Sequence, residues 1–226
     1  MPVRVKSKIH KKLFLLRIVV EKARPRGPPP HKDYFEGVVQ LRGLREEHYD
    51  YVHRFVERDG TWVTKEKEQP LGVDLWMSSQ KTIQKLANAL RDHFGCEIEI
   101  SRKIFTRDRQ TQKDVYRLNL LAEFPPFVKG EAIIVGDVPL YVNAIARRVS
   151  CTRLDNGKRT SVLSKQVKDA PLVTHECTVA KVMPGIEILD PETFQPAKAH
   201  NPFAFSIVPG QKVRAVLHNQ WYVIGA

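Results

Sequence analysis

The segment SSQKTIQKLANALRDHFGCEIEISRKIF, residues 78–105, has the clearest secondary-structure pattern in the chain. In its first part, apolar residues recur at intervals of three and four, a serine supplies an N-cap and Gly95 stands where a C′ glycine belongs, so we expect a helix. In its second part, isoleucines alternate with polar residues, as they do on a strand. The helical positions are Ile83, Leu86, Ala87, Leu90 and Phe94, and the strand positions are Ile98, Ile100 and Ile104.

A similar order of strand, helix and strand precedes this segment. The earlier helix is expected to bury Tyr49, Val52 and Val56, which share one face. Together the two strand–helix–strand units predict an α+β fold class and a small α/β sandwich domain over residues 33–126, with the helices on one face of a sheet. The predicted strands are 34–41, 71–77, 97–105 and 115–124, and the predicted helices are 44–58 and the segment that ends at Phe94.

Pro125-Pro126 ends this domain, and an all-β pattern follows. Short runs of valine and isoleucine are separated by turn residues at intervals that are typical of small sandwiches and barrels. A turn at 155–157 and a break near 169–171 divide the region. We expect two small β-barrels in tandem, over 127–171 and 172–226. Their predicted strands are 140–153, 159–163, 177–182, 185–189 and 212–223.

The positive charge of the chain is concentrated at its N-terminus. The formal net charge is +12, and residues 1–32 carry +9 of it. We interpret residues 1–32 as a basic arm that contains an apolar strand at 13–20 and a proline-rich linker at 25–30. Such a concentration indicates binding to a polyanion, and we favour RNA. The alternative is a basic tail that is merely solvated.

Two further basic clusters lie in predicted hairpins. One surrounds the polar connection at 106–114, and the other surrounds the turn at 155–157. Arginine-rich loops can contact RNA phosphates without reading sequence, whereas the alternative is a solvated, salt-bridged hairpin. Tyr34, Phe35, Trp62 and Trp76 could stack on bases, but their spacing fits burial at least as well. The candidate RNA-binding residues are Arg4, Lys6, Lys8, Lys11, Lys12, Arg24, Arg26, Arg102, Lys103, Arg107, Arg109, Lys113, Arg147, Arg148, Arg153, Lys158 and Arg159.

Motifs for catalysis, metals and membranes are missing from the sequence. It has no phosphate-binding loop, no GxGxxG, no HExxH and no GxSxG, and no apolar run of the length that a membrane span needs. The three cysteines, Cys96, Cys151 and Cys177, are far apart and form no CxxC pair, so we interpret them as structural thiols of a cytoplasmic protein. We therefore expect no enzyme activity, no metal and no cofactor.

Several stretches together resemble the archaeal branch of the family named for nonsense-mediated mRNA decay protein 3. They are YFEGVVQLRG at 34–43, GVDLWMSSQKTIQKLANAL at 72–90 and SRKIFTRDRQTQKDVYRLNLLAEF at 101–124. AKVMPGIEILDPETFQP at 180–196 and VPGQKVRAVL at 208–217 are similar to the nucleic-acid-binding barrel of translation factor 5A. The resemblance implies that the first barrel is SH3-like and the second OB-like.

The resemblance also implies a function. A member of this family would be a non-catalytic assembly factor of the large ribosomal subunit that binds ribosomal RNA. It would occupy the exit and peptidyl tRNA sites near the L1-stalk protein and depend on a GTPase for release. Since a factor bound to one subunit has no need of a dimer, we expect a monomer. Family members usually begin with zinc-binding cysteine pairs that contact a subunit anti-association factor. The region before Tyr34 has no cysteine, which leaves that contact doubtful. Two alternatives stay open: a translation factor that acts on mature ribosomes or tRNA, and an RNA-processing enzyme with an unrecognised site.

Overall fold

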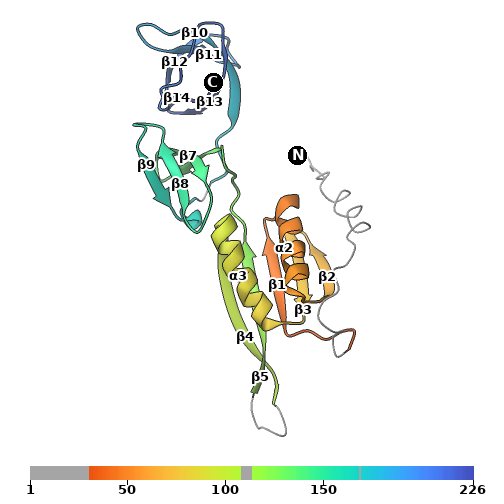
Figure 1. The fold of residues 1–226 in the computed structure, drawn as a ribbon. Coiled ribbons are helices and arrows are strands. Elements are labelled where there is room, and N and C mark those ends of the chain that lie inside the picture. The colour runs from red at the N-terminus through yellow and green to blue at the C-terminus, as the bar shows by residue number, and fades with distance from the viewer. Residues whose placement is uncertain (1–30, 108–113, 168) are drawn as a thin grey trace, which may run out of the picture. The chain divides into compact units, whose positions relative to one another are not determined.

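The computed structural model describes residues 31–107, 114–167 and 169–226 (Figure 1). The chain forms two compact units. Unit 1 extends to Leu90 and includes Ile98–Phe124, whereas unit 2 contains Arg91–Glu97 and Pro125–Ala226. The predicted strand at 13–20 and the proline-rich linker lie outside the described residues. Each unit is described by itself below.

Unit 1 contains a five-stranded sheet with the order β2-β3-β1-β5-β4. The central strand β1 pairs antiparallel with β3 and parallel with β5. Among the described residues, two helices complete the unit, so the predicted α+β class is confirmed for this part of the chain. The strands are β1 (Gly37–Arg42), β2 (Val63–Gln69), β3 (Gly72–Met77), β4 (Glu97–Arg107) and β5 (Asp114–Glu123), and the helices are α2 (Glu46–Asp59) and α3 (Gln80–Phe94).

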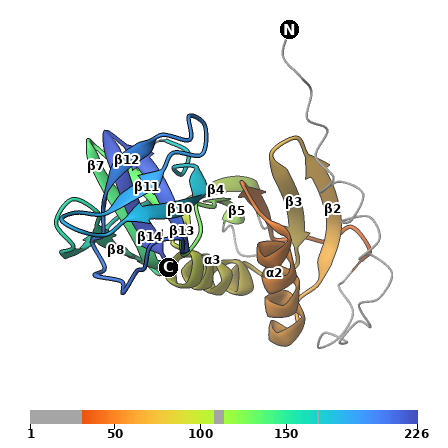
Figure 2. The same cartoon turned by 90° about the horizontal axis from the view of Figure 1, so that it is seen from above.

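Both helices of unit 1 lie on the same side of the strands (Figure 2). The core of the unit is apolar and lies between the helices and this face of the sheet, where every second residue of β1, β3 and β5 is buried. Gly95 has a φ of +62°, which confirms the C′ position expected for α3. The core includes Val39, Leu41, Leu75, Met77, Leu118 and Leu120 from the strands and Val52, Val56, Ile83, Leu86 and Leu90 from the helices.

The sequence pattern missed strand β2. Its sequence, VTKEKEQ, is strongly charged, and all its side chains are exposed or half-buried. As an edge strand it pairs only with β3, and its alternation of Lys and Glu has no apolar face that periodicity could detect.

Unit 2 contains two β-structures in series. The first is a four-stranded antiparallel sheet with the order β6-β7-β8-β9, followed by a short 3-10 helix at Ser164–Gln166. The second is a closed barrel with the order β10-β11-β12-β14-β13. The strands are β6 (Ala132–Val135), β7 (Val138–Ala144), β8 (Val149–Arg153), β9 (Arg159–Val162), β10 (Thr174–Lys181), β11 (Glu187–Leu189), β12 (Pro196–His200), β13 (Lys212–His218) and β14 (Gln220–Gly225).

Two of the predicted long strands are wrong, because each is a hairpin. The segment 140–153 turns after Ala144, and β7 and β8 then pair antiparallel. The segment 212–223 turns at Asn219, which has a φ of +60°, so that β13 pairs with β14. Asparagine tolerates this left-handed conformation, but a single Asn within an apolar run is a weak turn signal.

The described residues of unit 2 form three apolar cores. One belongs to the four-stranded sheet and includes Ile133, Val142 and Cys151, and the second fills the closed barrel around Ile188 and Trp221. The third combines residues of both structures: Ala132 and Leu154 come from the first, and Val216, Tyr222 and Ile224 come from the barrel. The two β-structures therefore share a core and are packed against each other.

Candidate nucleic-acid interface

The structure describes only part of the predicted RNA-binding set. The arm residues Arg4, Lys6, Lys8, Lys11, Lys12, Arg24 and Arg26 lie outside the described residues, as do Arg109 and Lys113, and of Arg107 only the backbone is described. The remaining candidates are at two places: Arg102 and Lys103 on β4 in unit 1, and five residues around β8 and β9 in unit 2.

The hairpin formed by β4 and β5 extends beyond α3 (Figure 1). Its length explains this, because the 11 residues of β4 span about 36 Å at about 3.3 Å per residue. The 15 residues of α3 span only about 22 Å at about 1.5 Å per residue. The far half of the hairpin therefore extends past α3, and no helix of the described residues covers it; it is called the uncovered half below.

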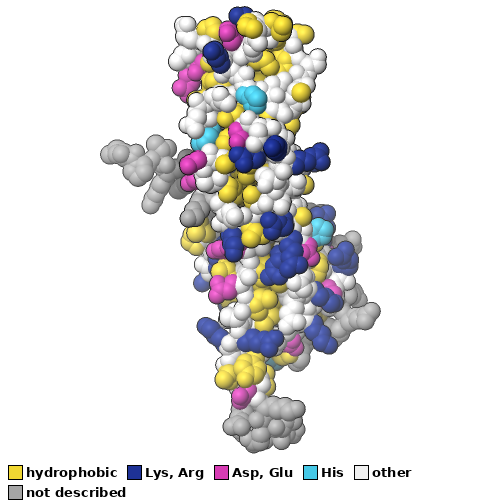
Figure 3. Space-filling model, turned by 90° about the vertical axis from the view of Figure 1, so that its left-hand side faces the viewer, with side chains coloured by type: hydrophobic (Ala, Val, Ile, Leu, Met, Phe, Trp, Pro, Cys, Tyr) yellow, Lys and Arg dark blue, Asp and Glu magenta, His cyan; other side chains and the backbone are white. Residues whose placement is uncertain are grey.

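Large apolar side chains are exposed on this uncovered half. Ile104 is 65% exposed and Phe105 is 55% exposed, and Val115 and Tyr116 of β5 are exposed as well, as is Ile100 in the near half of β4. Hydrophobic side chains are visible beside the end of the hairpin in Figure 3. The alternation of isoleucines correctly predicted the strand, and on it Ile100 and Ile104 are exposed.

Arg117 is held between two aromatic rings on this hairpin. Its guanidinium carbon lies 3.8 Å from the ring centroid of Phe35 and 3.4 Å from that of Phe105. Arg117 and Phe105 must lie on the sheet face away from the helices, because the alternate β5 residues Leu118 and Leu120 are buried in the core. Stacking on aromatic faces fixes a guanidinium and leaves its charge available.

The described basic side chains of the hairpin, Arg102, Lys103 and Arg117, are not paired with carboxylates. Within the described residues, no carboxylate forms an ion pair with Arg102, Lys103 or Arg117. Arg102 and Lys103 are both exposed, and as neighbours on a strand they point to opposite faces. Lysine and arginine side chains are also frequent elsewhere on the surface (Figure 3). The hairpin thus presents unpaired positive charge beside exposed aromatic surface.

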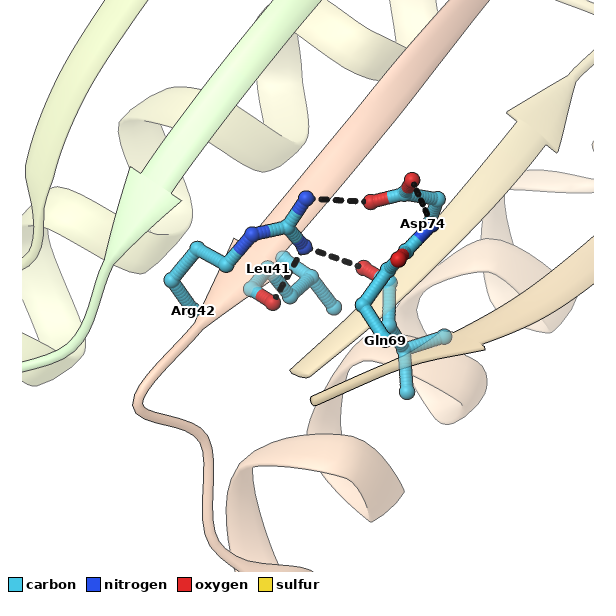
Figure 4. Close-up of polar contacts among 5 residues, drawn as sticks. Leu41, Arg42, Gln69 and Asp74 are labelled. Carbon is cyan, nitrogen blue, oxygen red and sulfur yellow. Dashed lines mark hydrogen bonds and ion pairs between the residues drawn. The ribbon is translucent and has the colours of Figure 1, made fainter. Parts of the chain in front are cut away.

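Arg42 lies on the same face of the sheet, away from the helices, and its guanidinium forms hydrogen bonds within the protein (Figure 4). Its guanidinium donates to Asp74 Oδ1 at 2.7 Å and to the carbonyl oxygens of Leu41 and Val73. Gln69 Nε2 donates to the other oxygen of Asp74 at 3.0 Å. The backbones of β1 and β3 lie close together here, since a Cβ added at Gly72 would be 1.8 Å from the Leu41 carbonyl oxygen. Asp74 thus balances the charge of Arg42, and both side chains join β1 to β3.

The aromatic residues considered in the sequence have different surroundings. Phe35 is part of the Arg117 stack. Tyr34 donates its hydroxyl to Glu36, and this hydrogen bond raises the pKa of the tyrosine. Trp76 lies under Lys65, with the ammonium 5.0 Å from the ring centroid, and Trp62 is half-buried. The sequence did not reveal the stack, because its three residues come from three separate segments.

The five predicted residues of unit 2 do not form one cluster. Since β7 and β8 are separate strands, Arg147 and Arg148 precede β8, whereas Arg153 ends it. Arg148 donates to the Ser161 hydroxyl and carbonyl oxygens, each at 3.2 Å. Arg153 forms a two-point ion pair with Asp155. The pair weakens the case for Arg153 as a phosphate ligand.

The turn between β8 and β9 also does not project freely. Leu154, which begins it, is fully buried in the third core. Gly157 has a φ of +69° and lies against Pro202 of the barrel, whose carbonyl oxygen would be 2.9 Å from an added Cβ. Lys158 and Arg159 follow this packed turn. We expected a loop that could reach into RNA grooves, and the structure instead places it where the two β-structures meet.

The described residues show few groups suited to other chemistry. No three of their His, Cys, Asp and Glu side chains are arranged to hold a metal ion, and none of their helices is long and apolar enough to cross a membrane. Cys96, Cys151 and Cys177 are free and buried. Burial raises the thiol pKa of Cys96 to about 12 and that of Cys151 to about 11, and it also raises that of Cys177. Such thiols are poor nucleophiles at neutral pH.

Residues 34–123 match the family model described as NMD3, second domain. The match covers most of unit 1 and confirms, over that domain, the family resemblance noted in the sequence. No curated protein matches the chain. Among solved structures, eukaryotic translation initiation factor 5A from Methanococcus jannaschii is similar at 14% sequence identity and a TM-score of 0.32, over 44% of this chain and 89% of that chain.

Proposed function

We propose that this chain, an NMD3-like protein, is a non-catalytic assembly factor of the large ribosomal subunit. It would bind ribosomal RNA and occupy the exit and peptidyl tRNA sites near the L1 stalk, with a GTPase required for its release. The match of residues 34–123 to the NMD3 second domain carries the proposal, because it assigns unit 1 to that family.

The described hairpin gives this proposal a physical basis. It combines exposed Arg102 and Lys103 with Arg117, none of which is paired with a carboxylate of the described residues. Phosphates neutralised by such side chains release counterions, so binding should weaken as salt increases. A protein that only occupies a site on RNA needs complementary charge and shape but no catalytic group. This agrees with a role in assembly rather than in RNA processing.

The test is cosedimentation of the purified protein with large subunits, small subunits and full ribosomes, at about 0.15 M salt, where long-range electrostatics are largely screened. We expect binding to free large subunits alone. Equal binding to all three particles would contradict the proposal, and binding mainly to full ribosomes would favour the translation-factor alternative.

A double variant, Arg102→Glu with Lys103→Glu, tests the hairpin in the same assay. It should reduce cosedimentation and lower the slope of log K against log salt by about 2 if both residues contact phosphates. The matched control is Arg54→Glu with Lys81→Glu, two exposed residues on the helices that undergo the same change of charge. Equal losses in both variants would show that only net charge matters.

A further inference from the structure

We propose that Phe105, supported by Arg117 and Phe35, is a stacking site for an unpaired RNA base. The inference rests on the proposed RNA-binding function and specifies the part of RNA that the hairpin would recognise. It concerns a binding site on the face of the unit 1 sheet that points away from the helices, within the uncovered half of the β4–β5 hairpin.

The first step is the geometry of the ring. Phe105 is on a strand, and one face of its ring is covered by the Arg117 guanidinium at 3.4 Å. Phe35 holds the same guanidinium from its other side, at 3.8 Å. The three groups form a layered stack that restrains the Phe105 ring, while 55% of that residue stays exposed. A restrained aromatic ring loses little conformational entropy when a base stacks on it.

The second step is the charge around the ring. Lys103 lies two residues before Phe105 on β4 and therefore on the same face. Among the described side chains of this half of the hairpin, Arg102, Lys103 and Arg117 are basic and Asp114 is acidic, whereas Glu97, Glu99 and Glu123 are at the other end of the two strands. A base on Phe105 would thus have its neighbouring phosphates within the basic half of the hairpin. Stacking beside backbone charge is how proteins hold single strands.

The third step is the comparison with Phe194, the other exposed phenylalanine of the described residues. Phe194 is 75% exposed, but it follows Asp190 and Glu192 in a turn in which Asp190 accepts hydrogen bonds from the backbone. Its surroundings would repel phosphate. Exposure alone therefore does not define the site, whereas the combination of ring, cation and unpaired charge at Phe105 does.

The unpaired positive charge beside Phe105 favours RNA over a protein as the occupant, and the two faces of β4 provide a way to test this. Ile104 is exposed on the opposite face of the same strand, so a hydrophobic protein partner would be expected to use Ile104 as well. A base would use Phe105 only, because Arg117 and Phe35 are on that face. The two occupants can be separated by single substitutions.

The experiment measures binding of the full chain to a fluorescent single-stranded RNA 12-mer and to a duplex of the same sequence. Phe105→Ala should weaken binding to the single strand about 5- to 150-fold, which corresponds to about 1–3 kcal/mol for one stacked base. Duplex binding and its salt slope should stay unchanged, because paired bases are not available to stack. Phe105→Trp should keep the affinity of the wild type.

Two controls complete the design. Ile104→Ala and Phe194→Ala remove exposed apolar side chains of the same chain and should leave RNA binding unchanged. A wild-type chain that does not bind the single strand, or a Phe105→Ala variant that binds it normally, would overturn the inference. Equal losses for Ile104→Ala and Phe105→Ala would show that single-strand binding depends on exposed apolar side chains on both faces of β4 and not on stacking at Phe105, and would also overturn the inference.

The cosedimentation assay separates this inference from the proposed function. If the wild type selects large subunits and Phe105→Ala has no effect on single-stranded RNA, the stacking site fails while the assembly role stands. If Phe105→Ala has the expected effect but the wild type shows no preference among ribosomal particles, the stacking site stands and the assembly role fails.

Discussion

His48 shows at the scale of a residue how this fold responds to acid. The ring lies within the first turn of α2 and stacks on Phe124, with centroids 4.2 Å apart. Its Nδ1 accepts a hydrogen bond from the backbone N–H of Arg45, which requires that this nitrogen carry no proton. Burial, reinforced by the positive charge of Arg45, lowers the pKa of His48 to about 4. The histidine is therefore neutral in the folded protein at pH 7.

The low pKa predicts a loss of stability in mild acid. Between pH 6.5 and 4 the unfolded chain binds a proton at His48 and the folded chain does not, so the free energy of unfolding falls as the pH falls. The loss should total roughly 3 kcal/mol, at about 1.4 kcal/mol per pH unit. Denaturant unfolding of the wild type and of His48→Gln at several pH values measures it.

Glutamine is the informative replacement, since its side-chain oxygen can accept the same hydrogen bond from the N-cap backbone but does not titrate. His48→Gln should be less stable at pH 7 because it lacks the stacked ring, yet its stability should change less between pH 6.5 and 4. Parallel pH profiles for the two proteins would show that His48 does not titrate as inferred.

At the scale of elements, sequence patterns predicted the helices and strands whose apolar residues recur at regular intervals. The α3 helix, its Gly95 cap and the alternation of β5 follow from apolar spacing, because burial on one face imposes that spacing. β2 was missed because a charged edge strand buries no such face. The break between β7 and β8 was missed because residues 145–148, Ile-Ala-Arg-Arg, contain none of the Gly, Pro, Asn or Asp residues that mark a turn.

The candidate site depended on a different kind of information. Residues 102 and 103 could be selected from composition, since charge needs no neighbour to be recognised. The stack of Phe35, Arg117 and Phe105 could not, because it forms only when β5 pairs with β1 on one side and β4 on the other. The same pairing information was needed to see that the turn after Arg153 packs against the barrel.

The shared core of unit 2 leads to a prediction about coupling between elements. Leu154 is fully buried among residues of both β-structures. Leu154→Ala should cost about 2–5 kcal/mol, the range for large-to-small changes in a core. It should speed amide hydrogen exchange both in β8 and in β13, because each structure loses contact with the other.

Ile188→Ala provides the comparison, because Ile188 is equally buried but belongs to the barrel core alone. It should speed exchange in the barrel strands and leave β8 as in the wild type. If Leu154→Ala changes exchange in only one of the two structures, the third core does not couple them.

At the scale of the whole molecule, charge is the strongest asymmetry. Residues 1–32 carry +9, while residues 33–226 together carry +3. If the arm binds RNA, most of the salt dependence of binding must come from it, because each phosphate neutralised adds about 0.9 to the slope on a duplex. The β4–β5 hairpin would then position the RNA and stack on a base, and the arm would contribute most of the electrostatic free energy of binding.

Removal of residues 1–32 tests this division. The slope of log K against log salt on duplex RNA should fall, by up to about 9 if all ten basic residues contact phosphates. A variant whose arm is replaced by a neutral Gly/Ser segment of equal length should behave like the deletion, because charge and not chain length is responsible. An unchanged slope would mean that the arm binds no RNA, and the hairpin would have to supply the salt dependence. If the deletion lowers the salt slope but the chain still prefers single-stranded RNA, the arm supplies the electrostatic part of the affinity and Phe105 supplies base recognition. This is the division that we expect from the charge distribution and the aromatic stack.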